Sequence, residues 1–191
     1  MKIDFIQILK ENGLSPKEIL ALAQSFKTVE IAKNKYFVRY EDRMNKIGIL
    51  LEGIMISRFT AESSGKEIVS KFYYPNGDFI VVDFNSFKDK KCSTEEIQAI
   101  SNSKLMILSF DKYHDLIQKY PSIQKMVKDF AEQSYLKALN RIKDFQSLSK
   151  VELIRNFTEN HKEILNQIQV QDKASYLGMS RNVFTNNLKK I

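Results

Sequence analysis

Hydrophobic residues along this chain recur first with a helical period, then with a strand period, and then with a helical period again. The first helical stretch has two parts. Asn12-Gly13 ends the earlier part, and Ser15-Pro-Lys-Glu18 gives the later part a capping box with proline at its first position. The apolar positions that set this period are Ile3, Phe5, Ile6, Leu9, Ile19, Leu20, Leu22, Ala23 and Phe26. The pattern therefore predicts helices on both sides of a β-rich region, which is an α+β arrangement.

Short β-rich runs separated by turn residues fill the segment from about residue 28 to residue 109. About eight strands are expected, at residues 29–31, 36–40, 46–51, 54–59, 67–72, 79–84, 96–100 and 104–109. We expect hairpin turns at Glu52-Gly53 and between Glu62 and Gly65. Regular spacing of short strands favours a closed roll or barrel, which also removes exposed sheet edges.

The segment from residue 168 to residue 191 has the pattern of two short helices joined by a tight turn. Val170, Ala174 and Leu177 are spaced i, i+4, i+7, so the first helix has one apolar face. Gly178 falls where this helix must end, because glycine adopts the left-handed conformation that a tight reversal needs. Ser180 then offers a side-chain oxygen as the N-cap of the second helix.

The second of these helices has an apolar face and a polar, basic face. The apolar face is predicted to contain Phe184 and Leu188, with Val183 beside them. We expect hydrogen bonds to base edges from Arg181, Asn182 and Asn186, with Thr185 secondary, and phosphate contacts from Lys189, Lys190 and Gln171. A generic amphipathic hairpin is the alternative. We favour a DNA-binding helix-turn-helix, because the small residue, turn glycine, cap and basic face occur together in register.

A long helix is predicted to begin at Pro121, after a short helix capped by Asp111. Apolar or small residues recur along it about every 3.5 positions, at Ile123, Val127, Phe130, Ser134, Ala138, Ile142 and Phe145. A stripe of this length needs a partner along its whole length. Packing on its own barrel is one possibility. We expect a homodimer instead, because a helix-turn-helix usually reads two half-sites as a dimer. Further short helices are expected at 150–160 and 163–168.

Composition and charge agree with DNA as a partner and argue against a membrane protein or a secreted, disulfide-bonded protein. The 191 residues carry a net charge of +7, which favours a polyanionic partner. The single cysteine, Cys92, cannot form an internal disulfide, and no segment has the pattern of a membrane span or a signal peptide. We therefore expect a cytoplasmic protein that does not bind membranes. The expected boundaries are 1–120 for a β region, 121–147 for the long helix and 148–191 for the helix-turn-helix.

Catalytic and metal-site classes find little support in the sequence. His114 and His161 are far apart, and one cysteine is too few for an iron–sulfur cluster. Cys92 beside Lys90 and Lys91 is a weak candidate for a redox thiol. We find no Ser-His-Asp set, phosphate-binding glycine loop or paired-histidine zinc motif. We expect no enzyme activity, no catalytic residue and no metal site.

In their order, these elements resemble the Crp/Fnr family of bacterial transcription regulators. The resemblance covers nearly the whole chain, and the short C-terminal part is most similar to compact regulators of the Bacteroidetes branch. It is carried by Leu50-Leu-Glu-Gly53, Gly65, Phe72-Tyr-Tyr-Pro-Asn-Gly-Asp-Phe79, Ile97-Gln-Ala-Ile-Ser-Asn-Ser-Lys-Leu105 and Ala174-Ser-Tyr-Leu-Gly-Met-Ser-Arg181. The resemblance implies an N-terminal cyclic-nucleotide-binding-like β-roll (a double-stranded β-helix) with flanking helices, a long dimerisation helix and a C-terminal helix-turn-helix domain. The implied partners are double-stranded DNA, a second copy of the chain and RNA polymerase.

The resemblance also implies an effector pocket in the roll. In the family's cyclic-nucleotide receptors, a Gly-Glu pair and a later Arg-Ser or Arg-Thr pair hold the ribose and the phosphate. Here Gly77-Asp78, followed by Phe79, matches the first pair, and Ser93-Thr94 falls at the second when counted back from Ala99.

The arginine of the second pair is missing, and two acidic residues, Glu95 and Glu96, follow directly. Lys90 and Lys91 are no geometric substitute for a guanidinium. A buried cyclic phosphate needs its charge met, so we do not expect cyclic AMP or cyclic GMP as the ligand. Either the roll is structural or it binds another small-molecule effector, and no cofactor is assigned.

The sequence thus predicts a sequence-specific DNA-binding transcription regulator with a degenerate effector domain. The alternative is a small-molecule- or partner-binding sensor module that has lost DNA binding. The chain stops at Ile191 without the family's usual β-wing, so we expect either a low affinity or a readout carried almost entirely by the second helix.

Overall fold

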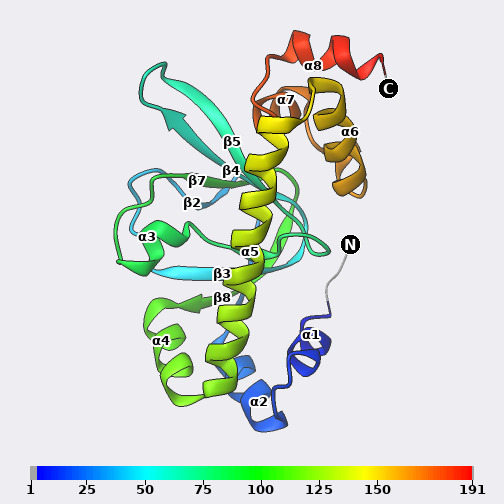
Figure 1. The fold of residues 1–191 in the computed structure, drawn as a ribbon. Helices are drawn as coiled ribbons and strands as arrows, with labels where there is room; N and C mark the ends of the chain where they lie inside the picture. Colours follow the sequence, from blue (N-terminus) through cyan, green and yellow to red (C-terminus); the bar gives the residue numbers. More distant parts are fainter. Residues whose placement is uncertain (1–3, 191) are drawn as a thin grey trace.

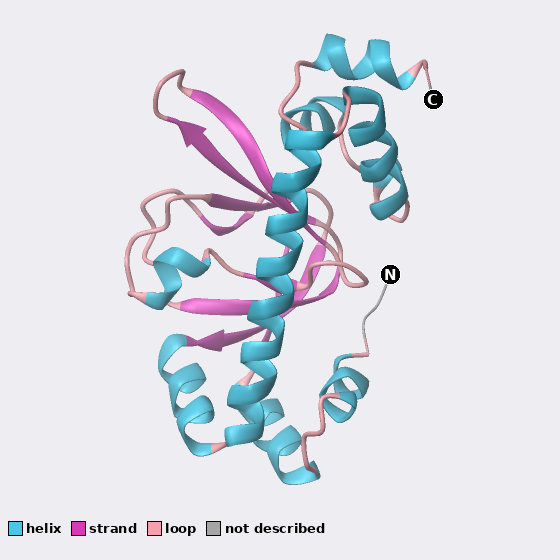
Figure 2. Ribbon diagram, in the orientation of Figure 1, coloured by secondary structure: helices cyan, strands magenta, loops and turns pink. Residues whose placement is uncertain are grey.

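The computed structural model describes residues 4–190, which form helices packed around antiparallel sheets (Figures 1 and 2). The α+β fold class is confirmed. Helix α1 spans Phe5–Glu11 and helix α2 spans Pro16–Ser25. The predicted capping box at the start of α2 is present, with Ser15 accepting from the backbone N–H of Glu18 and the Glu18 carboxylate accepting in return. Ile3 and Ile191 lie outside the described residues.

Eight strands follow, as predicted, and they form two four-stranded antiparallel sheets. Their bounds are β1 Lys27–Ile31, β2 Tyr36–Val38, β3 Lys46–Glu52, β4 Met55–Ala61, β5 Lys66–Tyr73, β6 Ile80–Val81, β7 Glu96–Ala99 and β8 Ser103–Ser109. One sheet has the order β1-β8-β3-β6 and the other β2-β7-β4-β5. The roll is therefore two sheets and not one closed barrel. Each sheet keeps two edge strands, contrary to the expectation that closure would remove them.

Only one of the two predicted hairpin turns joins paired strands. The turn from Glu62 to Gly65 links β4 to β5, which pair from Ala61 opposite Lys66 onward. The hairpin predicted at Glu52-Gly53 is wrong, because β3 pairs with β8 and β6 while β4 belongs to the other sheet. Gly53 makes this crossing with φ +97°, where a Cβ would lie 2.6 Å from the carbonyl oxygen of Asn102.

The segment from residue 79 to residue 88 is the clearest departure from the predicted elements. The expected strand at 79–84 is only two residues long, and a short helix, α3, runs from Phe84 to Lys88. Asp83 ends the extended backbone because its carboxylate accepts the N–H of Ser86 as the N-cap of α3. The apolar residues before Asp83 matched the pattern of a strand, so the hydrophobic periodicity alone did not predict this N-cap.

Helices occupy the rest of the chain. Their bounds are α4 Phe110–Lys119, α5 Pro121–Ser147, α6 Lys150–Asn160, α7 Val170–Tyr176 and α8 Arg181–Leu188, with a 3-10 turn at Leu165–Gln167 in place of the helix expected at 163–168. The N-cap of α4 is Ser109 and not Asp111, which lies in the first turn. Figure 1 shows α5 running past both sheets, from α4 and α2 at one end to α7 at the other.

Buried apolar residues show which elements pack together. Ile123 and Met126 at the start of α5 are buried in a cluster with α1, α2 and α4, and Phe130 packs against that cluster. The first third of the α5 stripe is therefore covered by its own chain, so the predicted need for a partner along the whole helix is wrong. A second cluster joins the roll to the C-terminal helices. It contains Ile54, Ile56, Val69, Phe72, Tyr74, Leu153, Ile154, Phe157, Ile164, Ile168, Ala174, Leu177, Met179 and Phe184.

Among residues 4–190, no helix has both the length and the apolar character that crossing a bilayer requires.

Candidate functional site

The turn between α7 and α8 has the geometry that the sequence predicted. Gly178 has φ +64°, and the backbone N–H of Met179 donates to the carbonyl of Ala174 at 3.0 Å. The Ser180 hydroxyl accepts from the backbone N–H of Val183 at 3.3 Å, so the predicted N-cap is confirmed. Ala174, Leu177 and Phe184 are buried. The two helices are therefore held at a fixed angle by a tight turn and a shared apolar seam.

The apolar faces of α7 and α8 are narrower than predicted. Val170 and Leu188 are exposed. Val170 is the first residue of α7 and Leu188 the last residue of α8, so neither has a further helical turn to cover it. Phe184 alone is the buried anchor of α8, with Val183 half-buried beside it.

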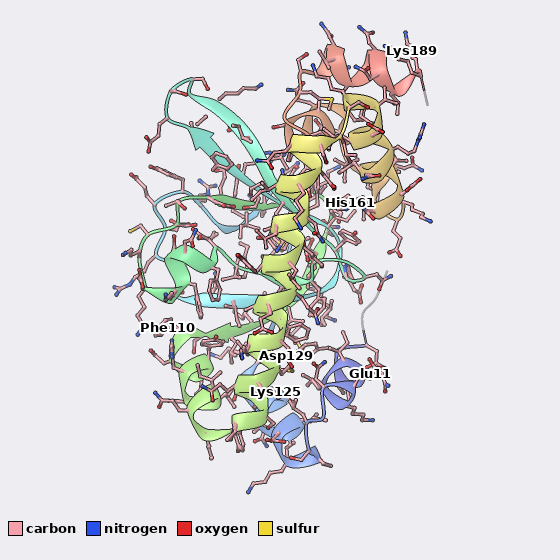
Figure 3. The ribbon with its side chains drawn as sticks, viewed as in Figure 1. Glu11, Phe110, Lys125, Asp129, His161 and Lys189 are labelled. Atoms are coloured by element: carbon pink, nitrogen blue, oxygen red, sulfur yellow. The ribbon has the colours of Figure 1, made fainter. Side chains whose placement is uncertain are left out.

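Every side chain proposed to contact DNA lies on the outside of this unit. Arg181, Asn182, Thr185 and Asn186 are exposed along α8, and Gln171 is exposed in the first turn of α7. Lys189 and Lys190 are exposed just beyond α8 and not on its face. Figure 3 labels Lys189 at the end of the molecule farthest from α4. The Thr185 hydroxyl donates to the Arg181 carbonyl at 2.9 Å, which leaves it free only to accept.

Polar contacts of three side chains, those of Arg58, Arg141 and Ser175, tie the helix-turn-helix to the roll and to α5. The Arg58 guanidinium on β4 lies 3.1 Å from the Asp172 carboxylate, and their side chains are only 15% and 13% exposed. Arg141 on α5 donates to the carbonyls of Ser70 at 2.7 Å and Tyr176 at 2.8 Å, and it stacks on the Tyr176 ring. The Ser175 hydroxyl accepts from the backbone N–H of Val69. These contacts fix α7 against β4 and β5.

His161, at the end of α6, lies inside this junction and not on a polar surface. Its ring contacts the rings of Phe72, Tyr74, Phe157 and Tyr176, and Figure 3 shows it between α5 and α6. Burial, reinforced by the charges of Arg141 and Lys137 and opposed by Asp78, lowers the pKa of His161 to about 4. The imidazole is therefore neutral at pH 7.

A cavity of about 760 Å³ lies between the roll and α5. Most of its wall is apolar, and it includes Phe5, Phe26, Phe79, Phe84, Phe87, Tyr113, Phe130 and Tyr135. The polar residues of the wall are Ser70, Lys71, Tyr73, Asp78, Asp83, Asn85, Glu95, Gln133, Ser134 and Lys137. A concave, mostly apolar space with a few converging polar groups is the usual form of a small-molecule site.

The structure places Gly77, Asp78 and Phe79 in the wall of this cavity. Gly77 closes a tight turn against the Tyr74 ring, where there is no room for a Cβ. Asp78 lies 2.7 Å from the Lys137 ammonium and 3.5 Å from that of Lys71. Burial opposes ionisation of Asp78, but these two lysines outweigh burial and hold the pKa of the carboxyl below its usual value. Asp78 thus links the roll to α5.

Ser93 and Thr94 are not in the cavity wall, unlike the pocket that the resemblance implied. Both donate to the Asp83 carboxylate, from the Ser93 hydroxyl and from the Thr94 backbone N–H, each at 3.0 Å. Ser86 donates to Asp83 as well, through its hydroxyl at 2.6 Å. Burial raises the pKa of Asp83, but the hydrogen bonds from these donors lower it by a larger amount, so the pKa lies below its usual value. The group that occupies this cluster of donors is the protein's own carboxylate.

Solved structures of bacterial regulators share the overall fold of this chain. The c-di-GMP-responsive global regulator CLP of Xanthomonas campestris superposes with a TM-score of 0.74 at 13% identity, over 92% of this chain and 91% of that one. FixK2 of Bradyrhizobium japonicum gives 0.73 at 10% identity, over 86% and 83%. A protein of Eubacterium rectale described as a Crp/Fnr-family transcriptional regulator gives 0.72 at 13%, over 94% and 84%. The chain has the Crp/Fnr regulator fold. No family sequence model and no curated protein matches the sequence.

Within this Crp/Fnr fold, the second half of α5 carries an exposed apolar surface. Tyr135, Leu136 and Ile142 are each more than half exposed, and Phe145 is also exposed. We call Ile142 and Phe145, the exposed apolar residues of the predicted stripe, the α5 face; Tyr135 and Leu136 lie outside that stripe. The α5 face contrasts with Ile123 and Met126 earlier on the same helix, which are buried.

The sequence did not single out several of the residues that shape the cavity of this Crp/Fnr fold. Lys71 and Lys137 reach Asp78 from β5 and from α5, and Asp83 organises the donors near α3. Lys137 is 59 positions from Asp78 in the chain, so no local spacing could have paired them. Asp83 had a detectable signal, because an Asp three residues before Ser86 fits an N-cap.

Proposed function

We propose that the chain belongs to the Crp/Fnr family and is a dimeric, sequence-specific DNA-binding transcription regulator that acts in the cytoplasm by binding and not by catalysis. The proposal rests on the structure of α8 and on the side chains that this helix exposes. Helix α8 has a serine cap and a single buried anchor, and it presents Arg181, Asn182 and Asn186 outward together. Guanidinium and amide groups suit the base edges of a major groove, and the two terminal lysines suit phosphates. The similar solved structures support the proposal through their shared fold.

The α5 face supports the dimer. Exposed apolar surface on a long helix is stabilised when a second copy covers it, and two copies joined along α5 would present two recognition helices to two half-sites. A ligand in the cavity would act on the same helix, because Lys137 contacts Asp78 and Arg141, one turn later, contacts the helix-turn-helix. A shift of α5 would then change the spacing of the recognition helices. RNA polymerase is a further partner of such a regulator.

The experiment that tests DNA recognition selects duplexes from a random library and then measures affinity against salt. We expect a palindromic preference and a steep decrease in affinity with salt. Arg181→Ala is expected to weaken binding by roughly 1–3 kcal/mol and to relax the preference at one base pair. Lys190→Ala is expected to weaken binding to all sequences alike and to flatten the salt dependence.

Lys125→Ala is the matched control, because it removes the same charge from an exposed lysine at the other end of the molecule (Figure 3). It should leave binding unchanged. Equal losses for Arg181→Ala and Lys190→Ala on selected and random duplexes would contradict the assigned roles. Absence of salt-dependent duplex binding would instead favour a ligand-binding module that does not contact DNA.

The dimer is tested separately by sedimentation. Ile142→Lys places a charge on the α5 face and should produce monomers, because a charge in a desolvated seam is costly. Phe130 is a poor probe for this purpose, since its ring packs on Phe79 with centroids 5.8 Å apart. An Ile142→Lys variant that still sediments as a dimer would exclude this face.

A further inference from the structure

The charged groups in the cavity wall are not balanced. Among the described lining residues, three are acidic and two are basic, namely Asp78, Asp83, Glu95, Lys71 and Lys137. Both lysines are within ion-pair distance of the same carboxylate, Asp78. In the described part of the chain, no ion pair forms at Asp83 or Glu95, so the cavity wall carries a net charge of −1 with two carboxylates that meet only neutral donors.

These two carboxylates differ in how much hydrogen-bonding capacity remains. An ionised carboxylate has about four acceptor positions. The Asp83 carboxylate accepts from Ser86, Ser93 and Thr94, and both Ser86 and Thr94 donate through two atoms. Its acceptor capacity is therefore used within the protein. Among residues 4–190, the Glu95 carboxylate accepts only from the hydroxyls of Ser57 and Ser70. Glu95 therefore retains acceptor capacity in the cavity wall.

In the described part of the cavity wall, no cation is free to meet an anionic ligand. Lys71 and Lys137 are already engaged by Asp78, and an incoming phosphate or carboxylate would have to displace it. The donors around α3 are already engaged by Asp83. An anion would also approach Glu95 without a cation to offset the repulsion, and an unpaired buried charge is costly. The wall thus disfavours cyclic nucleotides and other anions.

The remaining wall favours an apolar or aromatic body. Phe84 is 53% exposed and Tyr135 is 63% exposed, although both line the cavity. Covering them with a ligand removes apolar surface from water, which is favourable by about 25 cal/mol per Å². A volume of about 760 Å³ accommodates a molecule of drug-like size.

We propose that this cavity binds a small molecule with an apolar or aromatic body and a protonated amine, and that the Glu95 carboxylate accepts hydrogen bonds from the ammonium. This inference deepens the effector role in the proposed function and names its chemical class. A charge-assisted hydrogen bond to Glu95 fixes the cationic end, while the aromatic wall from Phe79 to Phe84 and the side of α5 enclose the body.

The test is calorimetry at pH 7 on the full chain with three probes that share an indole ring. Tryptamine carries an ammonium, 3-methylindole is neutral, and indole-3-propionate is anionic. We expect tryptamine to bind about tenfold more tightly than 3-methylindole, as a charged hydrogen bond contributes, and indole-3-propionate to bind most weakly. Equal or tighter binding of indole-3-propionate, or no measurable binding of tryptamine at millimolar concentration, would overturn the proposal.

Glu95→Gln then assigns the contact. It should reduce tryptamine affinity about tenfold and leave 3-methylindole unchanged. Glu67→Gln is the matched control, because Glu67 is exposed on β5 and does not line this cavity. An unchanged tryptamine affinity in a folded Glu95→Gln chain would overturn the role of Glu95. If that variant fails to fold, the three probes on the unaltered chain still decide the charge preference. None of these measurements uses DNA, so their failure is distinguishable from failure of the DNA-binding proposal.

Discussion

Two regions of the molecule contain partly buried charged groups. One is the junction between the roll and the helix-turn-helix, and the other is the cavity between the roll and α5. The two regions differ in the partners that these charged groups have. In the junction, the Arg58 guanidinium meets Asp172, and Arg141 meets two backbone carbonyls and an aromatic ring. In the cavity, the Glu95 carboxylate accepts from two hydroxyls among the described residues, and about 760 Å³ stays open beside it. Unused acceptor capacity next to open volume points to ligand binding. The junction charges instead face other protein groups at close range, although the buried Nε of Arg141 has no hydrogen-bond partner among residues 4–190.

The two regions adjoin at β5 and at one turn of α5. Ser70 belongs to both, because its carbonyl accepts from Arg141 while its hydroxyl donates to Glu95. Lys137 and Arg141 are four residues apart on α5, the first bonded to Asp78 in the cavity wall and the second to Tyr176 of α7. A change at the cavity therefore has a short physical route to the helix-turn-helix through a single helical turn.

The largest expected effect comes from the core of the junction. Phe157→Ala should destabilise the protein by about 3–5 kcal/mol, because it removes a buried ring from the cluster that joins the roll to α6, α7 and α8. Urea unfolding followed by circular dichroism should show one transition at a lower midpoint. Phe84→Ala, in the cavity wall, is the control and should cost less than about 1 kcal/mol, since Phe84 is more than half exposed. A separate early transition for the C-terminal helices would break the idea of one shared core.

A pH effect of about 2–3 kcal/mol is expected from His161, since a tenfold difference in proton affinity between the folded and unfolded chains corresponds to about 1.4 kcal/mol. Burial lowers the pKa of His161 in the folded protein to about 4, against 6.5 for a solvated histidine. Between pH 6.5 and pH 4 the unfolded chain therefore binds more protons than the folded one. This stability is fully present above pH 6.5 and is lost as the pH falls toward 4.

The measurement for His161 is the free energy of unfolding at about pH 7 and about pH 4.5, on either side of most of this titration, for the unaltered chain and for His161→Phe. The variant should lose most of the difference between the two pH values. An unchanged pH dependence in His161→Phe would show that carboxylates, and not this imidazole, produce it.

The comparison also shows what the sequence could predict. Periodicity located the eight strands, α5 and the α7–α8 turn, because each depends on local patterns such as Gly178 and Ser180. It missed α3, where a cap at Asp83 overrides an apolar run. It could not predict the Asp78–Lys137 pair or the environment of His161, because both depend on segments that are distant in sequence and meet only in the fold.

A smaller effect is expected at the ion pair of the junction. Asp172→Asn should cost roughly 1–2 kcal/mol, because Arg58 loses its counter-charge while largely buried, although Gln98 still accepts from it at 2.9 Å. Asp129→Asn removes an exposed partner of Lys125 on α5 and should cost under about 0.5 kcal/mol. Thermal unfolding of both variants checks the prediction. Equal costs would mean that burial does not strengthen the junction pair.

A small effect on stability, together with a change in the ligand preference of the cavity, is expected for Lys137→Gln. Its side chain is 61% exposed and Asp78 keeps Lys71 at 3.5 Å, so unfolding should change by less than about 1 kcal/mol. The pKa of Asp78 should rise toward its ordinary value, because one of the two cations that lower it is gone.

The net charge of the cavity wall falls from −1 to −2 at neutral pH in Lys137→Gln. Tryptamine affinity should therefore rise about two- to fivefold while that of indole-3-propionate decreases, since a nearby like charge disfavours an anion. Lys125→Gln, which makes the same charge change far from the cavity, should alter neither affinity. Parallel shifts for both probes in Lys137→Gln would mean that shape, and not charge, selects the ligand of this cavity.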